Sequence, residues 1–112
     1  MIDLTVLVPT YNEEATILGI LKRVGEQRID GVNIEVVVVD DGSTDNTLEL
    51  LEQNPDLYAK LIKRPLNGGK GAAVKTGLME ATGDYVLFQD ADLEYDPAEY
   101  EKLLAPVLNF DA

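Results

Sequence analysis

Two carboxylates separated by one small residue follow a short apolar run. Residues 85–88 are predicted to form a buried strand, and Asp90, Ala91 and Asp92 come after one glutamine. In extended backbone, residues two apart point to the same side, so both carboxylates face one point beyond the strand. At a separation of ~5.5 Å and an effective dielectric of 20 they repel by roughly 3 kcal/mol. A divalent cation between them would make the net electrostatic interaction at the site attractive. Mg²⁺ is commonly held by one or two carboxylates and completed by substrate phosphates. The sequence therefore predicts a metal–diphosphate site, against the alternative of a solvated acidic pair in a turn.

The composition restricts the metal and the chemistry. The 112 residues contain no cysteine and no histidine, so thiolate ligands, imidazole ligands and histidine-based catalysis are excluded. A metal must be bound by oxygen, which favours Mg²⁺, Mn²⁺ or Ca²⁺. The formal net charge of −12 argues against a nucleic-acid partner, because affinity for phosphate backbones comes from clustered Lys and Arg. No apolar run approaches the ~20 residues of a transmembrane helix.

Four apolar segments alternate with segments of helical periodicity. The strongest strand signal is 34–39, whose valine run suits a strand buried on both faces of a parallel sheet. Pro9 is expected to end the first strand, and Asn12 to cap the helix after it. The order β-α-β-α-β-α-β-α predicts a doubly wound, mostly parallel α/β sheet. The predicted strands are 4–8, 34–39, 59–63 and 85–88, and the predicted helices have their apolar faces within 17–24, 48–51, 74–81 and 100–107.

Polar clusters follow three of the predicted strands. They lie at residues 9–13, 40–43 and 90–92. Because ligands of such sheets bind beyond the carboxyl ends of the strands, we expect these clusters to meet at one edge. Within the first cluster, Tyr11 is either an aromatic face for a base or a cover for the sheet edge. Glu13 is either a ligand contact or an acidic residue that favours the start of a helix.

The glycine-rich segment 68–71 leads into a predicted helix and contains Lys70. It does not match the Walker phosphate-binding pattern, because Arg64 and Gly71 stand where Gly and Ser or Thr are required. Lys70 could meet a phosphate at the helix N-terminus, or the segment could be only a helix-start turn.

Two other acidic motifs fit less well. A calcium loop beginning at Asp90 is rejected because Tyr95 stands where glycine is required, and because a strand precedes it. A receiver domain of a signalling protein would need its acidic pair after the first strand and a lysine after the last. Here Asp40 and Asp41 follow the second strand, which disfavours that hypothesis.

The order of these segments resembles the family 2 glycosyltransferases with the GT-A fold. Residues 8–14, 38–45, 67–71 and 90–92 resemble four blocks of that family in sequence order, so the resemblance covers nearly the whole chain. It is closest to the dolichyl-phosphate mannosyltransferase-like branch, in which Gly-Asp-Tyr precedes the apolar strand and Asp-Ala-Asp-Leu follows it. The resemblance implies transfer of a sugar from a UDP- or GDP-linked donor, often to a polyprenyl phosphate.

The resemblance also assigns roles by position. Asp40 or Asp41 would bond the base or ribose, and Asp90 and Asp92 would bind Mg²⁺ or Mn²⁺ that bridges the diphosphate. Glu94 stands where relatives often place Gln as a further metal ligand, which leaves its role open. The full nucleotide-sugar-binding set that the resemblance implies is Pro9, Thr10, Tyr11, Glu13, Asp40, Asp41, Lys70, Asp90, Ala91 and Asp92.

The resemblance further implies that residues 1–112 are a single domain, the N-terminal donor-binding part of a longer GT-A domain. In this family the acceptor site and any catalytic base lie beyond the metal-binding block. We therefore expect no catalytic residue here beyond the metal site, weak nucleotide binding, and no sugar transfer by this segment alone. We expect a cytoplasmic protein, either free or associated with the cytoplasmic face of a membrane.

Two alternative functions stay open from the sequence. One is a nucleotidyltransferase of nucleotide-sugar synthesis, disfavoured because residues 9–12 contain neither the glycine nor the cation expected there. The other is a non-catalytic, Mg²⁺-binding receiver-like domain. The donor base, sugar, acceptor, stereochemical outcome and oligomeric state are not determined by the sequence.

Overall fold

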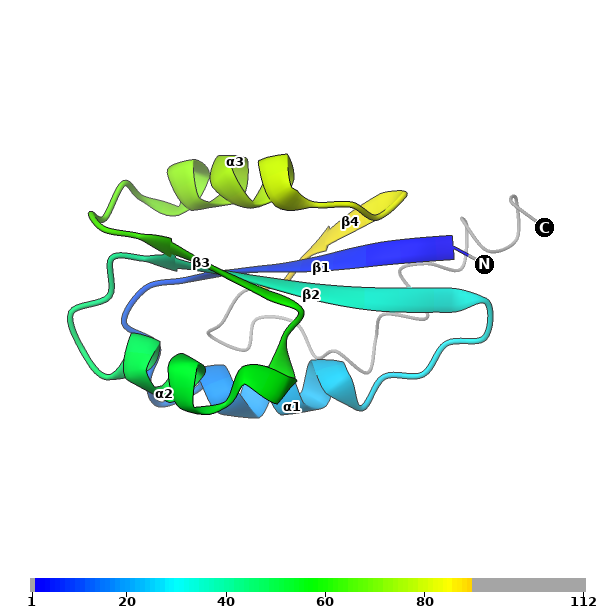
Figure 1. The fold of residues 1–112 in the computed structure, drawn as a ribbon, viewed down its shortest axis with the longest axis horizontal. Coiled ribbons are helices and arrows are strands. Elements are labelled where there is room, and N and C mark those ends of the chain that lie inside the picture. Colours follow the sequence, from blue (N-terminus) through cyan, green and yellow to red (C-terminus); the bar gives the residue numbers. More distant parts are fainter. Residues whose placement is uncertain (1, 90–112) are drawn as a thin grey trace.

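The computed structural model describes residues 2–89, which form a parallel sheet with helices on both faces (Figure 1). The sheet order is β3-β2-β1-β4, and every neighbouring pair is parallel. The predicted α/β class with a parallel sheet is confirmed. The four strands are β1 (Ile2–Thr10), β2 (Val32–Asp41), β3 (Lys60–Arg64) and β4 (Tyr85–Phe88).

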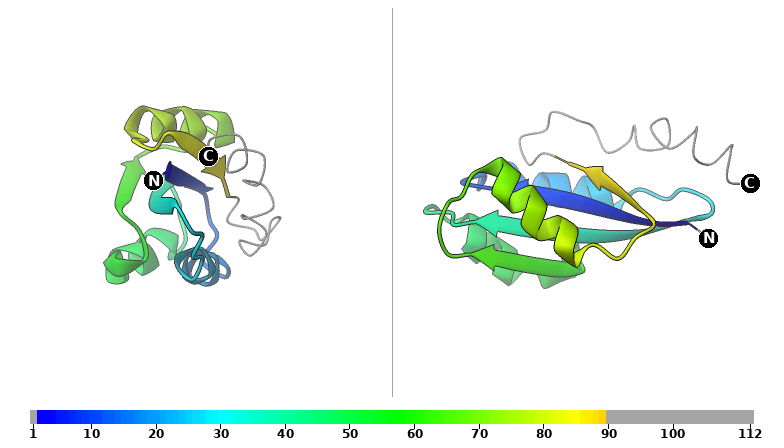
Figure 2. Two further views of the ribbon diagram at one scale, coloured as in Figure 1. Left: turned by 90° about the vertical axis from the view of Figure 1, so that its right-hand side faces the viewer. Right: turned by 90° about the horizontal axis from the view of Figure 1, so that it is seen from above.

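Helices cover the two faces of the sheet unequally. α1 and α2 pack on one face and α3 on the other, as both views of Figure 2 show. The connections through α1 and α2 build the sheet outward to β3, and the connection through α3 then carries the chain back past β1 to β4. The helices are α1 (Ile17–Gly25), α2 (Thr47–Gln53), the short 3₁₀ helix η1 (Pro55–Leu57) and α3 (Lys70–Glu80).

Strand alternation divides the core into two layers. Successive residues of a strand point to opposite faces, and the valine run of β2 therefore serves both. The layer toward α1 and α2 includes Leu4, Val6, Val8, Val36, Val38, Ile17, Ile20, Leu21, Val24 and Leu51, and the layer toward α3 contains Leu7, Val37, Val39 and Ala73.

Among the described residues, none of the helices is both long and apolar enough to cross a bilayer.

The first strand continues through Pro9 to Thr10, so the expectation that Pro9 ends it is wrong. The Leu7 carbonyl accepts a hydrogen bond from the Gln89 amide, so odd residues of β1 direct their backbone groups toward β4. The described β1–β4 ladder ends at the pair Leu7–Phe88. The missing N–H of Pro9 therefore costs no bond in that ladder.

Helix starts and faces also differ from expectation. α1 begins at Ile17 and not at an Asn12 cap, and Asn46 stands at the N-cap of α2. α3 buries Ala73 and Gly77, whereas Leu78 is 46% exposed. A Cβ at Gly77 would clash with the Leu7 side chain, so glycine lets this helix lie close to β1. The predicted helix around 100–107 lies outside the described residues.

Candidate functional site

The predicted site residues within 2–89 lie at the carboxyl edge of the sheet. In the parallel register Thr10 lies opposite Asp40, so the ends of β1 and β2 are level. The strand order reverses between β1 and β4, which makes this the topological switch point where open α/β sheets bind ligands. Two of the three predicted polar clusters, 9–13 and 40–43, therefore meet at one edge.

Asn12 joins the turn after β1 to the turn after β2. Its side-chain oxygen accepts from the Thr44 and Asp45 amides at 2.8 and 3.3 Å, and its side-chain nitrogen donates to Thr44 Oγ1 at 3.2 Å. Its own amide donates to Ser43 Oγ at 3.0 Å. Asn12 has a φ of 51°, a left-handed conformation that asparagine adopts more readily than most residues. Its side chain and backbone thus hold the two turns in one arrangement.

Asp40 is buried and faces the α1–α2 side of the sheet. Its two carboxylate oxygens accept from the Ser43 hydroxyl at 2.6 Å and the Ser43 amide at 3.2 Å. Because the Ser43 hydroxyl also accepts from the Asn12 amide, a chain of hydrogen bonds leads from the first turn to this carboxylate.

Asp41 is buried as well but faces α3. It accepts from Arg64 Nε at 2.8 Å, from the Gly68 amide at 3.1 and 3.2 Å, and from the Gly69 amide at 2.8 Å. The adjacent aspartates therefore contact different loops, since neighbouring residues of a strand point to opposite faces. Lys70 is exposed and is the first residue of α3, directly after this loop.

The other residues of the first turn differ in exposure. Tyr11 is 39% exposed, whereas Pro9 and Thr10 are buried. Glu13 uses its amide to bond Thr47 Oγ1 at 2.9 Å, and its carbonyl accepts from the Ile17 amide that opens α1. These contacts place Glu13 at the start of the turn that leads into α1.

Asp45 strengthens the second turn electrostatically. Burial raises its pKa, but hydrogen bonds from the hydroxyl and amide of Thr47 outweigh burial and hold the pKa below the usual range. Sequence reasoning missed the structural contributions of Asn12, Ser43, Thr47 and Arg64. The available signal was the density of Asn, Asp, Ser and Thr after two strands, since these side chains bond nearby backbone groups in turns.

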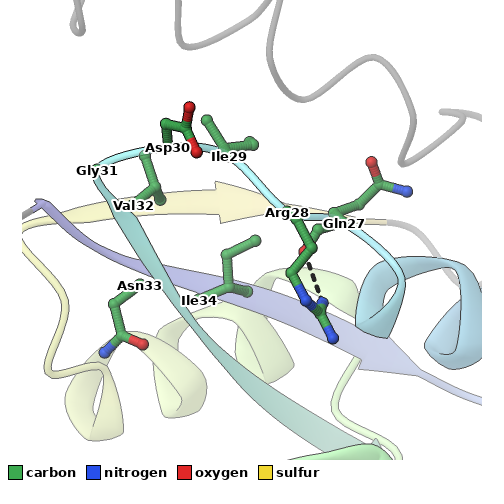
Figure 3. A pocket seen from close by; sticks show the side chains of 8 residues that line it. All are labelled: Gln27, Arg28, Ile29, Asp30, Gly31, Val32, Asn33 and Ile34. Atoms are coloured by element: carbon green, nitrogen blue, oxygen red, sulfur yellow. Dashed lines mark hydrogen bonds between the residues drawn. The ribbon is translucent and has the colours of Figure 1, made fainter.

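A cavity of about 420 Å³ lies at the opposite edge of the sheet (Figure 3). Residues 27–34 line it, around the start of β2. Its Arg28 guanidinium bonds the carbonyls of Gly25 and Gln27, so this cation is engaged with the adjacent helix end. The cavity is separate from the site at the carboxyl edge.

The predicted metal ligands Asp90, Asp92 and Glu94 lie outside the described residues, as does Ala91. Within residues 2–89 no three acidic, His or Cys side chains are grouped to hold a metal. β4 runs parallel to β1, so its carboxyl end points to the edge that holds the two joined turns.

The pattern of one protein family, "Glycosyl transferase family 2", matches residues 5–112. The chain belongs to this family. The sequence is 37% identical over 106 residues to a dolichol-phosphate mannosyltransferase of Pyrococcus furiosus, covering 94% of this chain and 30% of that protein. Family membership favours the glycosyltransferase hypothesis over the nucleotidyltransferase and receiver alternatives.

Solved structures of glycosyltransferases share the fold. The mannosyltransferase PcManGT of Pyrobaculum calidifontis, in complex with GDP-Man and Mn²⁺, superposes with a TM-score of 0.69 at 42% identity, over 80% of this chain and 27% of that one. TarS 1–349 of S. aureus, in complex with UDP-GlcNAc, gives 0.79 at 36% identity, over 96% and 31%. The predicted GT-A fold is thereby confirmed. The chain spans about three tenths of the length of these relatives.

Proposed function

We propose that this chain is the donor-binding part of a glycosyltransferase that takes its sugar from a nucleoside-diphosphate sugar. The observation that carries the proposal is the joining of the two turns by Asn12, level with Thr10 and Asp40, beside the switch point between β1 and β4. Solved relatives of the same fold hold GDP-Man and UDP-GlcNAc. They differ in base and sugar, so the proposal covers both UDP- and GDP-linked donors.

The nucleoside is proposed to lie over the joined turns. Tyr11 offers the exposed aromatic face on which a base can stack, while Pro9 and Thr10 form the buried floor beside it. The resemblance assigns Glu13 and Lys70 to the polar rim of this site, and Asp40 to its buried floor.

A divalent cation, Mg²⁺ or Mn²⁺, is proposed to be held by Asp90 and Asp92, with Glu94 as a further candidate ligand. The donor set fits, because a chain without His or Cys offers only oxygen ligands, which these hard cations prefer. When bound, the ion would neutralise charge on the diphosphate leaving group. The residues of this chain bind and orient the donor, and a polyprenyl phosphate is the proposed acceptor by analogy with the dolichol-phosphate relative.

Calorimetric titration tests the proposal. We expect UDP or GDP to bind only when MnCl₂ or MgCl₂ is present, and Asp92→Ala to weaken that binding about tenfold or more, the equivalent of one lost strong contact. Asp56→Ala is the matched control, because it removes an exposed carboxylate within η1, which precedes β3.

Four outcomes would contradict parts of the proposal. Absence of binding for both nucleotides with either metal overturns the donor assignment, and binding that survives in Asp92→Ala overturns the metal assignment. Binding of beryllofluoride with Mg²⁺, without nucleotide binding, would favour the receiver alternative. Sugar transfer by the purified 112-residue chain would contradict the expectation that the acceptor machinery lies elsewhere.

A further inference from the structure

The carboxylate of Asp41 is enclosed by the chain's own donors. Its side chain is 4% exposed, and its partners are Arg64 and the amides of Gly68 and Gly69. A carboxylate has two oxygens with about four acceptor positions. Here Oδ1 accepts from Arg64 and Gly68, and Oδ2 accepts from Gly68 and Gly69. Three N–H groups make these contacts, because the Gly68 amide is shared between the two oxygens. Together with the 4% exposure they leave little access for a base or a ribose hydroxyl.

The loop of residues 67–69, here called the glycine loop, is shaped around this carboxylate. A Cβ at Gly68 would lie 2.6 Å from Arg64 Nη2, so a side chain there would displace the guanidinium. A Cβ at Gly42 would lie 2.7 Å from the Asn67 amide, and Gly42 has a φ of 75°. Glycine at position 42 therefore leaves room for the glycine loop to lie close to the end of β2.

Arg64 is itself fixed from a second side. Its Nη1 donates to Thr76 Oγ1 at 2.6 Å, so one guanidinium connects the end of β2 to the middle of α3. Amides at a helix N-terminus commonly bind phosphate. At the start of α3 the two amides before Lys70 instead bind a carboxylate of the chain.

We propose that Asp41 and Arg64 are positioning residues that hold the glycine loop, and with it Lys70, for the phosphates of the donor, and that Asp41 does not contact the nucleoside. This inference rests on the proposed function of the carboxyl edge. It chooses between the two adjacent aspartates, since strand alternation turns Asp41 toward α3 and Asp40 toward the joined turns. Loss of either partner would free the loop and move the cation that begins α3.

The first experiment compares ligands with and without phosphate, using the full chain and MnCl₂ throughout. We expect Asp41→Asn and Arg64→Gln each to weaken binding of UDP or GDP about tenfold, while binding of uridine or guanosine is unchanged. The double variant is expected to be no weaker than either single variant, because both act through one contact. Arg64→Lys, which keeps the charge, is expected to recover part of the affinity. A general loss of folding would instead lower the affinity for both ligand classes.

The matched control is Lys63→Gln. Lys63 precedes Arg64 but pairs with Glu52 at 2.7 Å, and both side chains are about half exposed. It tests loss of a nearby cation without loss of the loop contact, and we expect no change in either affinity.

The second experiment needs no nucleotide. Amide hydrogen exchange of Gly68 and Gly69, followed by NMR, is expected to be faster in Asp41→Asn and Arg64→Gln than in the unaltered chain and in Lys63→Gln. Unchanged exchange in both variants would overturn the proposal that the pair holds the loop. Equal loss of nucleoside and nucleoside-diphosphate affinity in Asp41→Asn, with slow amide exchange retained in β1 and β2, would show that Asp41 contacts the nucleoside and that the variant is still folded. If the unaltered chain binds neither nucleotide, the proposed function and the role toward phosphate fall together, while the exchange rates still decide whether the pair holds the loop.

Discussion

The neighbouring aspartates show how single residues divide the work at the carboxyl edge. Asp40 bonds Ser43, in the turn that Asn12 joins to the end of β1, whereas Asp41 bonds the loop that opens α3. No motif distinguishes these roles, because both residues are buried acids in the same strand. The alternation of the strand does distinguish them, since it sends the two side chains to opposite layers.

Asn12 is predicted to matter through both its side chain and its backbone. Asn12→Ala removes the bonds to Thr44 and Asp45 and puts alanine at a positive φ that asparagine adopts more readily, so we expect the free energy of unfolding to fall by about 1–2 kcal/mol. Asn12→Gly loses the same bonds but tolerates the backbone, so its loss should be smaller. Denaturant titration measures both.

The control for Asn12 is Asn33→Ala. Asn33 is also exposed and makes one side-chain bond, to Asp3 at 3.2 Å, near the amino edge. Two results would show that other contacts hold the joined turns. One is a loss of unfolding free energy in Asn33→Ala as large as that in Asn12→Ala. The other is a larger loss in Asn12→Gly than in Asn12→Ala.

Glu35 provides a pH-dependent prediction. Burial raises its pKa, but bonds from the Thr82 and Thr5 hydroxyls, at 2.7 and 3.0 Å, and the charge of Lys60 outweigh burial, so the pKa lies below its ordinary 4.5. A lowered folded-state pKa gives stability that is present above pH 4.5 and lost as pH falls through the folded value. Glu35→Gln should therefore lower unfolding free energy at pH 7 by about 1 kcal/mol, with the deficit shrinking in acid.

Thermal or denaturant unfolding between neutral pH and acid checks this. Glu26→Gln is the control, because Glu26 is an exposed acid whose side chain makes no hydrogen bond or ion pair within residues 2–89, and its substitution should have little effect. If the loss of unfolding free energy in Glu35→Gln stayed constant with pH, the ionised carboxylate would not be the source of the stabilisation.

At the scale of elements, the sequence predicted the α/β order and the meeting of two polar clusters, because valine runs and turn residues act locally. It missed the extension of β1 through Pro9, since that depends on where the neighbouring ladder ends. It also missed the face of α3. The helical spacing of Val74, Leu78 and Ala81 predicted Leu78 on the buried face. The close approach is instead set by Gly77 against Leu7, a pairing of residues seventy positions apart.

Gly77 carries the packing of α3 on β1. In Gly77→Ala the added methyl group would clash with the ends of the Leu7 side chain, so we expect a loss of about 1–3 kcal/mol in unfolding free energy. Leu7→Val removes the clashing carbons, so Gly77→Ala should lower the unfolding free energy less in the Leu7→Val background than in the unaltered chain. Gly71→Ala, in the same helix with open space around it, should raise stability by about 0.4–1 kcal/mol. Equal effects at both glycines in denaturant titration would exclude the packing explanation.

At the scale of the whole molecule, the main feature is an excess of acidic residues outside two apolar core layers. The chain has 21 Asp and Glu against 9 Lys and Arg. Within residues 2–89 three ion pairs form. Two of them are largely exposed, so they contribute little to the free energy of unfolding. Both layers of the core are apolar, so stability depends on burial, and the surface charge opposes it through self-repulsion.

Added salt is therefore predicted to stabilise the chain. The screening length falls from about 30 Å at 0.01 M to about 10 Å at 0.1 M, which suppresses repulsion between separated acids but hardly affects the enclosed Asp41–Arg64 pair. We expect the melting temperature to rise by several degrees over this range in NaCl, since about 1 kcal/mol corresponds to 4–8 °C for a domain of this size. Lys75→Glu, at an exposed position of α3, increases the acidic excess and should steepen the dependence. A melting temperature that is flat or falls with NaCl would mean that favourable pairs outweigh repulsion, and stabilisation by MgCl₂ beyond that of NaCl at equal ionic strength would separate specific ion binding from screening.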